Sequence, residues 1–185
     1  MSGDEDRFDG VYRRYHAKVA AYCRRRSNAD EYEDLVAEVF LAVWRKIGQA
    51  PRDEDVLPWL YRIAYLVLTN HWRRNYRVGR VQESLRVIGV PSPPALDEQL
   101  VMRKELQDVL AAAARLRTRD QEILRLSLWE QLSHEEIGTV LDIQPNAAKQ
   151  RLHRARKALI MEHTRLSGSP KRPQHSPTAR EGGEW

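Results

Sequence analysis

The amino-acid sequence predicts an all-α protein made of two small helical domains. Apolar residues recur three and four positions apart over long stretches, which is the spacing of one helix face. No stretch alternates apolar and polar residues as a half-buried strand would. Between the two periodic parts, residues 78–97 lose this periodicity and contain three prolines, so we interpret them as a flexible linker.

The composition favours an intracellular protein with a polyanionic partner. Among 185 residues, 31 are basic and 26 acidic, giving a formal net charge of +5, and the bases gather in two separate patches. No apolar run approaches the roughly 20 residues of a membrane span. The single cysteine, Cys23, excludes an internal disulfide and fits a cytoplasmic location. The histidines are scattered, so we expect no metal site and no cofactor.

Three helices are expected in the first domain, residues 1–77. The first helix has an apolar stripe from Phe8 to Tyr22. The segment SNAD, residues 27–30, offers helix-starting chemistry for the second, whose buried face runs from Leu35 to Ile47. Residues 48–58 are expected to form a loop, and a third helix follows with arginines crowded at its end.

The second domain is expected over residues 98–166. Helical periodicity resumes at Leu100, and Thr118 stands three residues before Gln121, which predicts a capping box. Residues 167–185 are rich in Ser, Pro, Gly and charge, and we expect them to form a disordered tail.

The strongest local pattern is a helix-turn-helix within residues 132–159. Ser133 and Glu136 have capping-box spacing, while Leu132 and Ile137 occupy the two positions of a hydrophobic staple. A helix is therefore predicted to begin near His134. The segment DIQP interrupts it, because its proline suits the first position of a new helix.

The second helix of such a motif places its N-terminal part in the major groove of DNA. Four residues are expected to face base edges: Asn146, Lys149, Gln150 and His153. Four more are expected mainly at phosphates: Arg151, Arg154, Arg156 and Lys157. The alternative is a solvated basic face on a helical bundle.

These residues resemble region 4 of bacterial extracytoplasmic-function (ECF) sigma factors of the sigma-70 family. The matching segments are LSHEEI, residues 132–137, and RLHRAR, residues 151–156. The first domain matches independently. EDLVAEVFLAVWRK, residues 33–46, looks like region 2.2, and PWLYRIAYLVLTNHWRR, residues 58–74, looks like regions 2.3 and 2.4.

The resemblance implies a factor without catalysis of its own, which binds core RNA polymerase and directs promoter-specific initiation. Region 2.2 would dock on the clamp helices of the beta-prime subunit through Asp34, Leu35 and Glu38, and region 4 would meet the beta flap. Region 4 would also bind the −35 element. The resemblance allows an anti-sigma factor as a further partner and gives no membrane role.

Regions 2.3 and 2.4 would recognise and open the −10 element, where unpaired bases can stack on aromatic rings. The candidates are Tyr61, Arg62, Tyr65, Asn70, His71, Trp72, Arg73, Arg74 and Arg77. Residues 49–57 match the loop that captures a flipped base, and their acidic side chains could accept hydrogen bonds from it. The chain departs from the family pattern at Leu66, Asn70 and residues 146–148, which predicts an unusual promoter preference. It also departs at Ala37, which removes one polar contact expected with polymerase.

The linker length agrees with this reading. Elements about 17 base pairs apart, the spacing usual for the family, are separated by roughly 58 Å at ~3.4 Å per pair. A linker of about 20 residues spans at most roughly 70 Å.

Two other classes of function stay open. A stand-alone helix-turn-helix regulator would explain residues 132–159 equally well, but not the paired motifs of the first domain. An enzyme would need a Gly-rich phosphate loop, a metal constellation or a nucleophile motif, and the sequence contains no such pattern.

Overall fold

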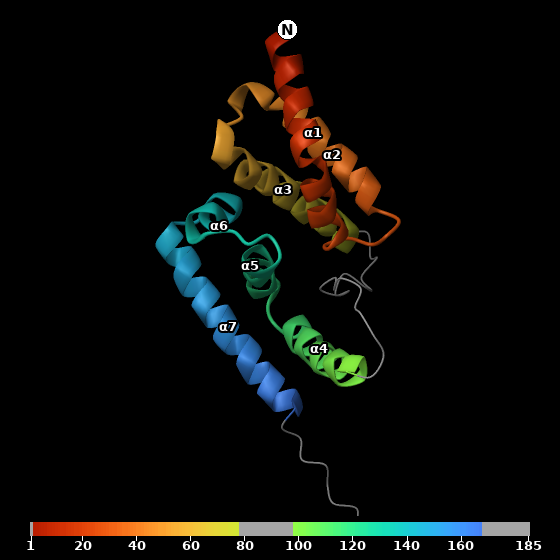
Figure 1. Cartoon of the computed structure of the whole chain (residues 1–185), viewed down its shortest axis with the longest axis vertical. Helices are drawn as coiled ribbons and strands as arrows, with labels where there is room; N and C mark the ends of the chain where they lie inside the picture. Colours follow the sequence, from red (N-terminus) through yellow and green to blue (C-terminus); the bar gives the residue numbers. More distant parts are fainter. Residues whose placement is uncertain (1, 78–97, 168–185) are drawn as a thin grey trace, which may run out of the picture.

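A computed structural model describes residues 2–77 and 98–167 (Figure 1). The described residues form seven α-helices and two short 3-10 helices, and none of them lies in a strand. The all-α prediction is therefore confirmed. The expected linker, and the tail from residue 168 onward, lie outside the described residues.

The first domain is a bundle of α1 (Ser2–Arg24), α2 (Tyr32–Arg45) and α3 (Val56–Arg77). The two 3-10 helices, Ile47–Gln49 and Asp53–Asp55, connect α2 to α3. All three helices contact one another, and their apolar stripes meet in one core. Its largest fully buried side chains in this domain include Tyr22, Leu60 and Leu68.

Two helix starts in this domain differ from their predicted positions. The SNAD segment forms a turn, and α2 begins only after Glu31, whose side chain makes no capping hydrogen bond. Helix α3 begins at Val56, so Pro58 occupies its third position. The first four amides of a helix have no intrahelical acceptor, and a proline there costs no hydrogen bond.

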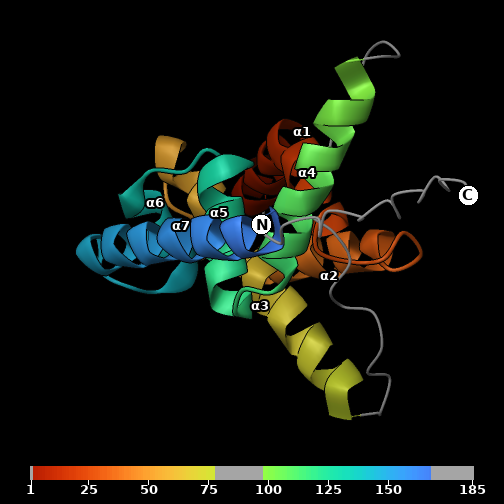
Figure 2. The same cartoon turned by 90° about the horizontal axis from the view of Figure 1, so that it is seen from below.

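The second domain comprises α4 (Glu98–Ala114), α5 (Thr118–Leu128), α6 (His134–Leu141) and α7 (Pro145–Ser167). Helix α7 contacts the other three, and Figure 2 shows it lying across them. The buried side of α7 carries Ala148, Leu152 and Ala155. These small and medium residues let the long helix approach its neighbours closely.

The capping box predicted at the start of α5 is wrong. Arg117, not Thr118, is the N-cap residue, and its side chain makes no capping hydrogen bond. Gln121 is buried, and its Nε2 donates to the carbonyl oxygens of Leu116 at 2.9 Å and Ala114 at 3.3 Å. The amide therefore satisfies acceptors at the end of α4 instead of a donor at the start of α5.

The two domains pack against each other, chiefly through α3 and α6 (Figure 1). Within residues 2–77 and 98–167, no helix combines the length and apolar character needed to cross a bilayer. In the same residues, no three His, Cys, Asp or Glu side chains are grouped as metal ligands would be.

Candidate nucleic-acid interface

The helix-turn-helix forms as predicted, from α6, a tight turn and α7. Ser133 Oγ accepts from the Glu136 amide at 3.2 Å, and Glu136 Oε2 accepts from the Ser133 amide at 2.7 Å. Both bonds of the capping box are thus present. Leu132 and Ile137 are buried, as their staple positions require. Helix α6 ends at Leu141 with Asp142 as its C-cap residue, and α7 begins at Pro145.

Gly138 lets the turn fold back closely onto α6. A Cβ atom at this position would lie 2.7 Å from the carbonyl oxygen of Ile143. The Ile143 amide donates to the Gly138 oxygen at 3.0 Å, so the two backbone segments are bonded as well as adjacent. Asp142, at the end of α6, takes the left-handed conformation with φ 58°, which Asp tolerates better than most residues.

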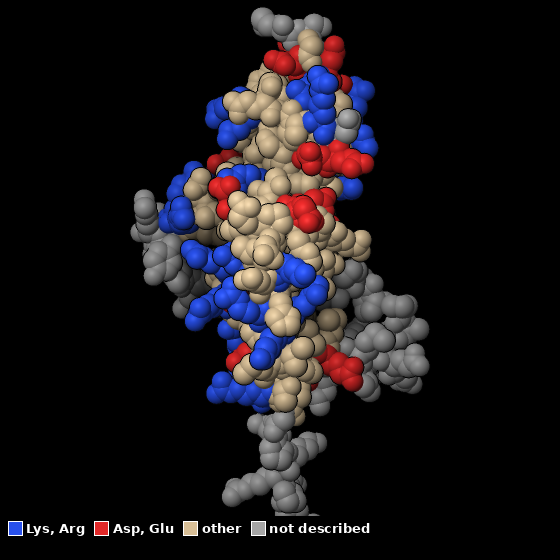
Figure 3. All heavy atoms as spheres, turned by 90° about the vertical axis from the view of Figure 1, so that its left-hand side faces the viewer, with Lys and Arg blue, Asp and Glu red and all other residues tan. Residues whose placement is uncertain are grey.

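The predicted recognition residues lie on the solvent-facing side of α7. Seven of them are exposed: Asn146, Lys149, Gln150, His153, Arg154, Arg156 and Lys157. Arg151 is half-buried. In the view of Figure 3, basic side chains predominate over the lower half of the molecule, where α7 runs. This arrangement offers donors and positive charge along one helix, as a major-groove reader requires.

The −10 candidates fall into two groups along α3. Asn70 and Arg73 are exposed toward its C-terminal end, and Trp72 is partly buried against the first domain's core. His71 Nε2 lies 3.3 Å from Glu31 Oε2, and Arg74 pairs with Glu38 at 3.0 Å. For Arg77 the structure describes only the backbone, at the end of α3.

Of the other three −10 candidates, Tyr61 is buried in the core, whereas Arg62 and Tyr65 face the second domain. Tyr61 is 3% exposed and stacks on Tyr22 with ring centroids 4.9 Å apart. Arg62 Nη2 lies 2.9 Å from Asp142 Oδ2, at the turn of the helix-turn-helix. Tyr65 shares a small cavity with residues of α5, α6 and α7. In this arrangement Tyr61 is buried, and Arg62 and Tyr65 are only partly exposed.

A buried charge network joins the domains beside these tyrosines. The Arg26 side chain is 0% exposed and lies 3.1 Å from Glu122 and 2.8 Å from Glu130. Its guanidinium carbon sits 3.6 Å from the centroid of the Tyr22 ring, and the Tyr22 hydroxyl donates to Glu122 at 3.0 Å. Arg25 also pairs with Glu130. We call Tyr22, Arg25, Arg26, Glu122 and Glu130 the interdomain cluster.

Burial and charge shift the pKa values in this cluster. Burial raises the pKa of Tyr22 well above its usual value and that of Tyr61 to about 12. Burial alone would lower the pKa of Arg26, but Glu122, Tyr22 and Glu130 outweigh it and raise that pKa. The arginine is therefore held charged by its carboxylate partners.

Sequence reasoning did not find the interdomain cluster. In the sequence, Arg25 and Arg26 belong to a run of three arginines, and both glutamates stand in a segment of mixed polar and apolar residues. The one available signal was Glu122, a charged residue at a position that helical periodicity places among apolar neighbours.

The residues expected to meet polymerase lie on both sides of α2. Asp34 and Glu38 are exposed, whereas Leu35 is 2% exposed and packs in the core. Leu35 therefore supports this helix from inside and does not present its side chain to a partner. In the loop between α2 and α3, Glu54 and Asp55 are exposed, and Arg7 donates to the carbonyl oxygens of Ala50 and Pro51. These bonds tie the loop to α1.

Comparison with protein families finds two matches along the chain. The family model for sigma-70 region 2 matches residues 11–78. The model for sigma-70 region 4 matches residues 106–159. Together the matched segments span well over half of the 185 residues.

Relatives with curated names resemble the chain over most of its length. The ECF RNA polymerase sigma-E factor of Escherichia coli K12 is 27% identical, over 86% of this chain and 87% of its own. The ECF RNA polymerase sigma factor SigW of Bacillus subtilis is 26% identical, over 85% of this chain and 89% of its own.

Solved structures show the same fold. The sigma factor RpoE of Bartonella quintana, in complex with the anti-sigma factor NepR, matches with a TM-score of 0.61 and 21% identity. The match covers 89% of this chain and 98% of that one. CnrH, in complex with the cytosolic domain of CnrY, matches with a TM-score of 0.60 and 21% identity. This match covers 91% of this chain and 92% of that one.

Proposed function

The chain belongs to the sigma-70 family as an ECF sigma factor, and from this premise we propose that it binds core RNA polymerase and selects promoters. The second domain reads −35 duplex through α7. The first domain recognises and opens the −10 element through α3. The protein catalyses no reaction itself and acts in the cytoplasm, where polymerase and DNA meet.

The observation that carries this proposal is the exposed basic face of α7 within a helix-turn-helix whose first helix is capped at both ends. Its base-facing set includes an amide, an imidazole and an ammonium group at Gln150, His153 and Lys149. Such donors and acceptors can discriminate base edges in the major groove. The family match of the first domain then separates a sigma factor from a stand-alone regulator, which would need no region 2.

The proposed function requires the two domains to separate. Arg62 and Tyr65 lie against the domain that would read −35 DNA, and Tyr61 is buried against Tyr22. Promoter elements about 17 base pairs apart lie roughly 58 Å from each other, whereas α3 and α6 are in direct contact. We infer that the packed arrangement is that of the free chain and that core polymerase binds the open one.

Partners follow from the same premise. Asp34 and Glu38 form the acidic face that would meet the beta-prime clamp helices, and the second domain would meet the beta flap. An anti-sigma factor is a further proposed partner, supported by the RpoE–NepR complex among the structures of the same fold.

Reconstituted transcription tests the proposal. Purified chain plus bacterial core polymerase, given a genomic promoter library, is expected to yield transcripts that core polymerase alone does not make. Gln150→Ala should reduce transcripts from these promoters, because it removes a base-reading group. Gln107→Ala, the same change at an exposed position of α4, should leave them unchanged.

Two results would contradict this proposal. One is the absence of any promoter-specific transcript across the library with several core polymerases. The other is binding to a duplex operator that excludes core polymerase, which would favour the stand-alone regulator.

A further inference from the structure

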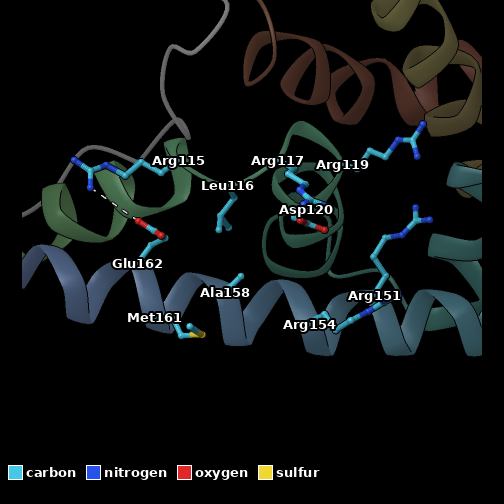
Figure 4. Close-up of a pocket in the computed structure, with 10 residues that line it drawn as sticks. All are labelled: Arg115, Leu116, Arg117, Arg119, Asp120, Arg151, Arg154, Ala158, Met161 and Glu162. Carbon is cyan, nitrogen blue, oxygen red and sulfur yellow. Dashed lines mark ion pairs between the residues drawn. The ribbon is translucent and has the colours of Figure 1, made fainter.

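Arginines of the turn between α4 and α5 and of α5 gather beside the recognition helix α7. The turn between α4 and α5, the first turn of α5 and one side of α7 enclose a cavity of about 580 Å³ (Figure 4). Five arginines line it: Arg115, Arg117, Arg119, Arg151 and Arg154. We call this cavity the arginine groove.

The groove is preformed. Leu116 is buried at its base, and the partly buried Ala158 of α7 packs against the core beside it. Gln121 holds the turn by donating to the Leu116 oxygen at 2.9 Å. The arginine side chains therefore stand on a fixed backbone, and a ligand would not have to order the turn.

Most of the positive charge in the groove lacks a partner. Arg115 is 3.9 Å from Glu162, which is also 3.9 Å from Arg165. The other four arginines of the groove form no ion pair with any acid that the structure describes. Asp120 is the one further carboxylate among the residues that line the groove. Like charges held together without counter-charges repel, and an external polyanion would relieve that repulsion.

The groove is continuous with the face proposed to read DNA. Arg151 and Arg154 line it and also belong to the predicted phosphate contacts of α7. Arg117 and Arg119 extend the same positive surface from α7 onto α5 (Figure 4). A DNA backbone leaving the major groove that α7 occupies would find guanidinium groups on both helices. Guanidinium groups suit phosphate because they form paired hydrogen bonds with its oxygens.

We propose that the arginine groove binds the phosphate backbone flanking the −35 element, with Arg117 and Arg119 as additional contacts. This inference rests on the proposed function, because it places duplex DNA on α7. The contacts carry no base information. They add affinity and fix the register in which α7 presents its base-reading residues.

Salt-dependent binding of the full chain to a fluorescent duplex tests the groove. The duplex is taken from a transcribed promoter, and a scrambled duplex is measured in parallel. The double variant Arg117→Gln, Arg119→Gln should make the negative slope of log K against log salt shallower by about 1.8, which is roughly 0.9 per lost phosphate contact. Between 50 and 200 mM salt, wild type would then lose about 12-fold more affinity than the variant.

The matched control is Lys18→Gln with Arg24→Gln on α1. It makes the same change in net charge at exposed positions of the other domain, so its slope should equal that of wild type. Asp120→Asn should change DNA affinity in the opposite direction to the groove variant. Removal of the carboxylate should tighten binding about twofold to fivefold, the size of a partly exposed charge interaction.

The outcomes separate the groove from the proposed function. Equal salt slopes for wild type and the groove variant on both duplexes would overturn the proposal that the groove binds DNA. The proposal would also be overturned if the groove variant lost core polymerase binding while its salt slope for DNA stayed unchanged, because the groove would then be a protein contact. A slope difference on both duplexes without any preference of wild type for the promoter duplex would support the groove and count against −35 reading.

Discussion

Tyr22, Cys23 and Arg26 lie within five residues near the end of α1, and burial affects each differently. Arg26 stays charged because two carboxylates accompany it into the interior. Burying a charge without such partners costs several kcal/mol. Tyr22 and Cys23 are favoured in their neutral forms, because the interior disfavours a phenolate or a thiolate.

Cys23 predicts a measurable alkaline weakening of the fold. Burial raises the pKa of its thiol from 9.0 to about 12. Above pH 9 the unfolded chain releases this proton while the folded chain keeps it, so stability falls as pH rises from 9 toward 12. In urea denaturation, the free energy of unfolding of wild type should drop between pH 8 and pH 10 by about 1.4 kcal/mol more than that of Cys23→Ala.

The Cys23→Ala comparison isolates the thiol because the other titrating groups are common to both proteins. The variant is less stable overall because it lacks the sulfur, but this loss is the same at pH 8 and pH 10. It therefore does not affect the change in free energy of unfolding between the two pH values. An identical pH dependence for the two proteins would show that the thiol ionises equally easily in both states.

At the scale of elements, α6 and its turn combine three local structural features within ten residues: two helix caps and one close backbone approach. The capping box fixes the start of α6, and the left-handed Asp142 fixes its end. Gly138 allows the turn to pass within reach of a hydrogen bond. The angle between α6 and α7, and so the presentation of the recognition face, depends on that close approach.

Gly138→Ala should therefore destabilise the second domain. The new methyl group would meet the Ile143 oxygen at 2.7 Å and push the turn away. Overpacking of this kind costs about 1–3 kcal/mol, against a gain of up to ~1 kcal/mol from helix propensity. We expect a lower melting temperature and weaker duplex binding.

Gly10→Ala is the matched control, because nothing lies within 4 Å of a Cβ atom there. This change, also within a helix, should be neutral or stabilising by up to about 1 kcal/mol. If both glycine variants gained stability, the close approach at Gly138 would not be a constraint.

At the scale of the whole molecule, the interdomain cluster decides which surfaces are accessible. It ties the end of α1 to α5 while α6 lies on α3, so the −10 candidates Arg62 and Tyr65 are partly covered. The recognition face of α7 stays exposed in the same arrangement. The packed chain would thus present its −35 surface first and its −10 surface only after the domains part.

Glu122→Gln with Glu130→Gln should open the molecule. These changes leave Arg26 buried without a counter-charge, and breaking a buried pair in this way costs about 3–5 kcal/mol. Separation of the domains restores water to the guanidinium. Small-angle scattering should therefore show a larger radius of gyration, with helix content by circular dichroism retained.

Asp9→Asn is the control for this variant. It breaks the exposed pair between Asp9 and Arg13, which lie 2.6 Å apart, and surface pairs contribute at most about 1 kcal/mol. Its radius of gyration should match wild type. An unchanged radius in the double glutamine variant would mean that apolar contacts of α3 with α6 suffice to hold the domains together.

The sequence was sufficient to predict the helices, the cap and staple of α6 and the exposed side of α7, because these depend on residues three to seven positions apart. It misplaced the cap of α5, since whether Gln121 bonds the amides of its own helix or the carbonyls of α4 depends on how the two helices meet. Local patterns specify each helix and its apolar side.

The residues that pack on α3 and the partners of the buried charges follow from the tertiary structure. Arg26 and Glu122 are 96 positions apart, and no local pattern relates them. Likewise, Arg117 and Arg119 join Arg151 and Arg154 in one groove only because α5 packs against α7. Periodicity identifies which side of a helix is buried, but the partner of that side is chosen by packing across the whole chain, and the accessible sites depend on that choice.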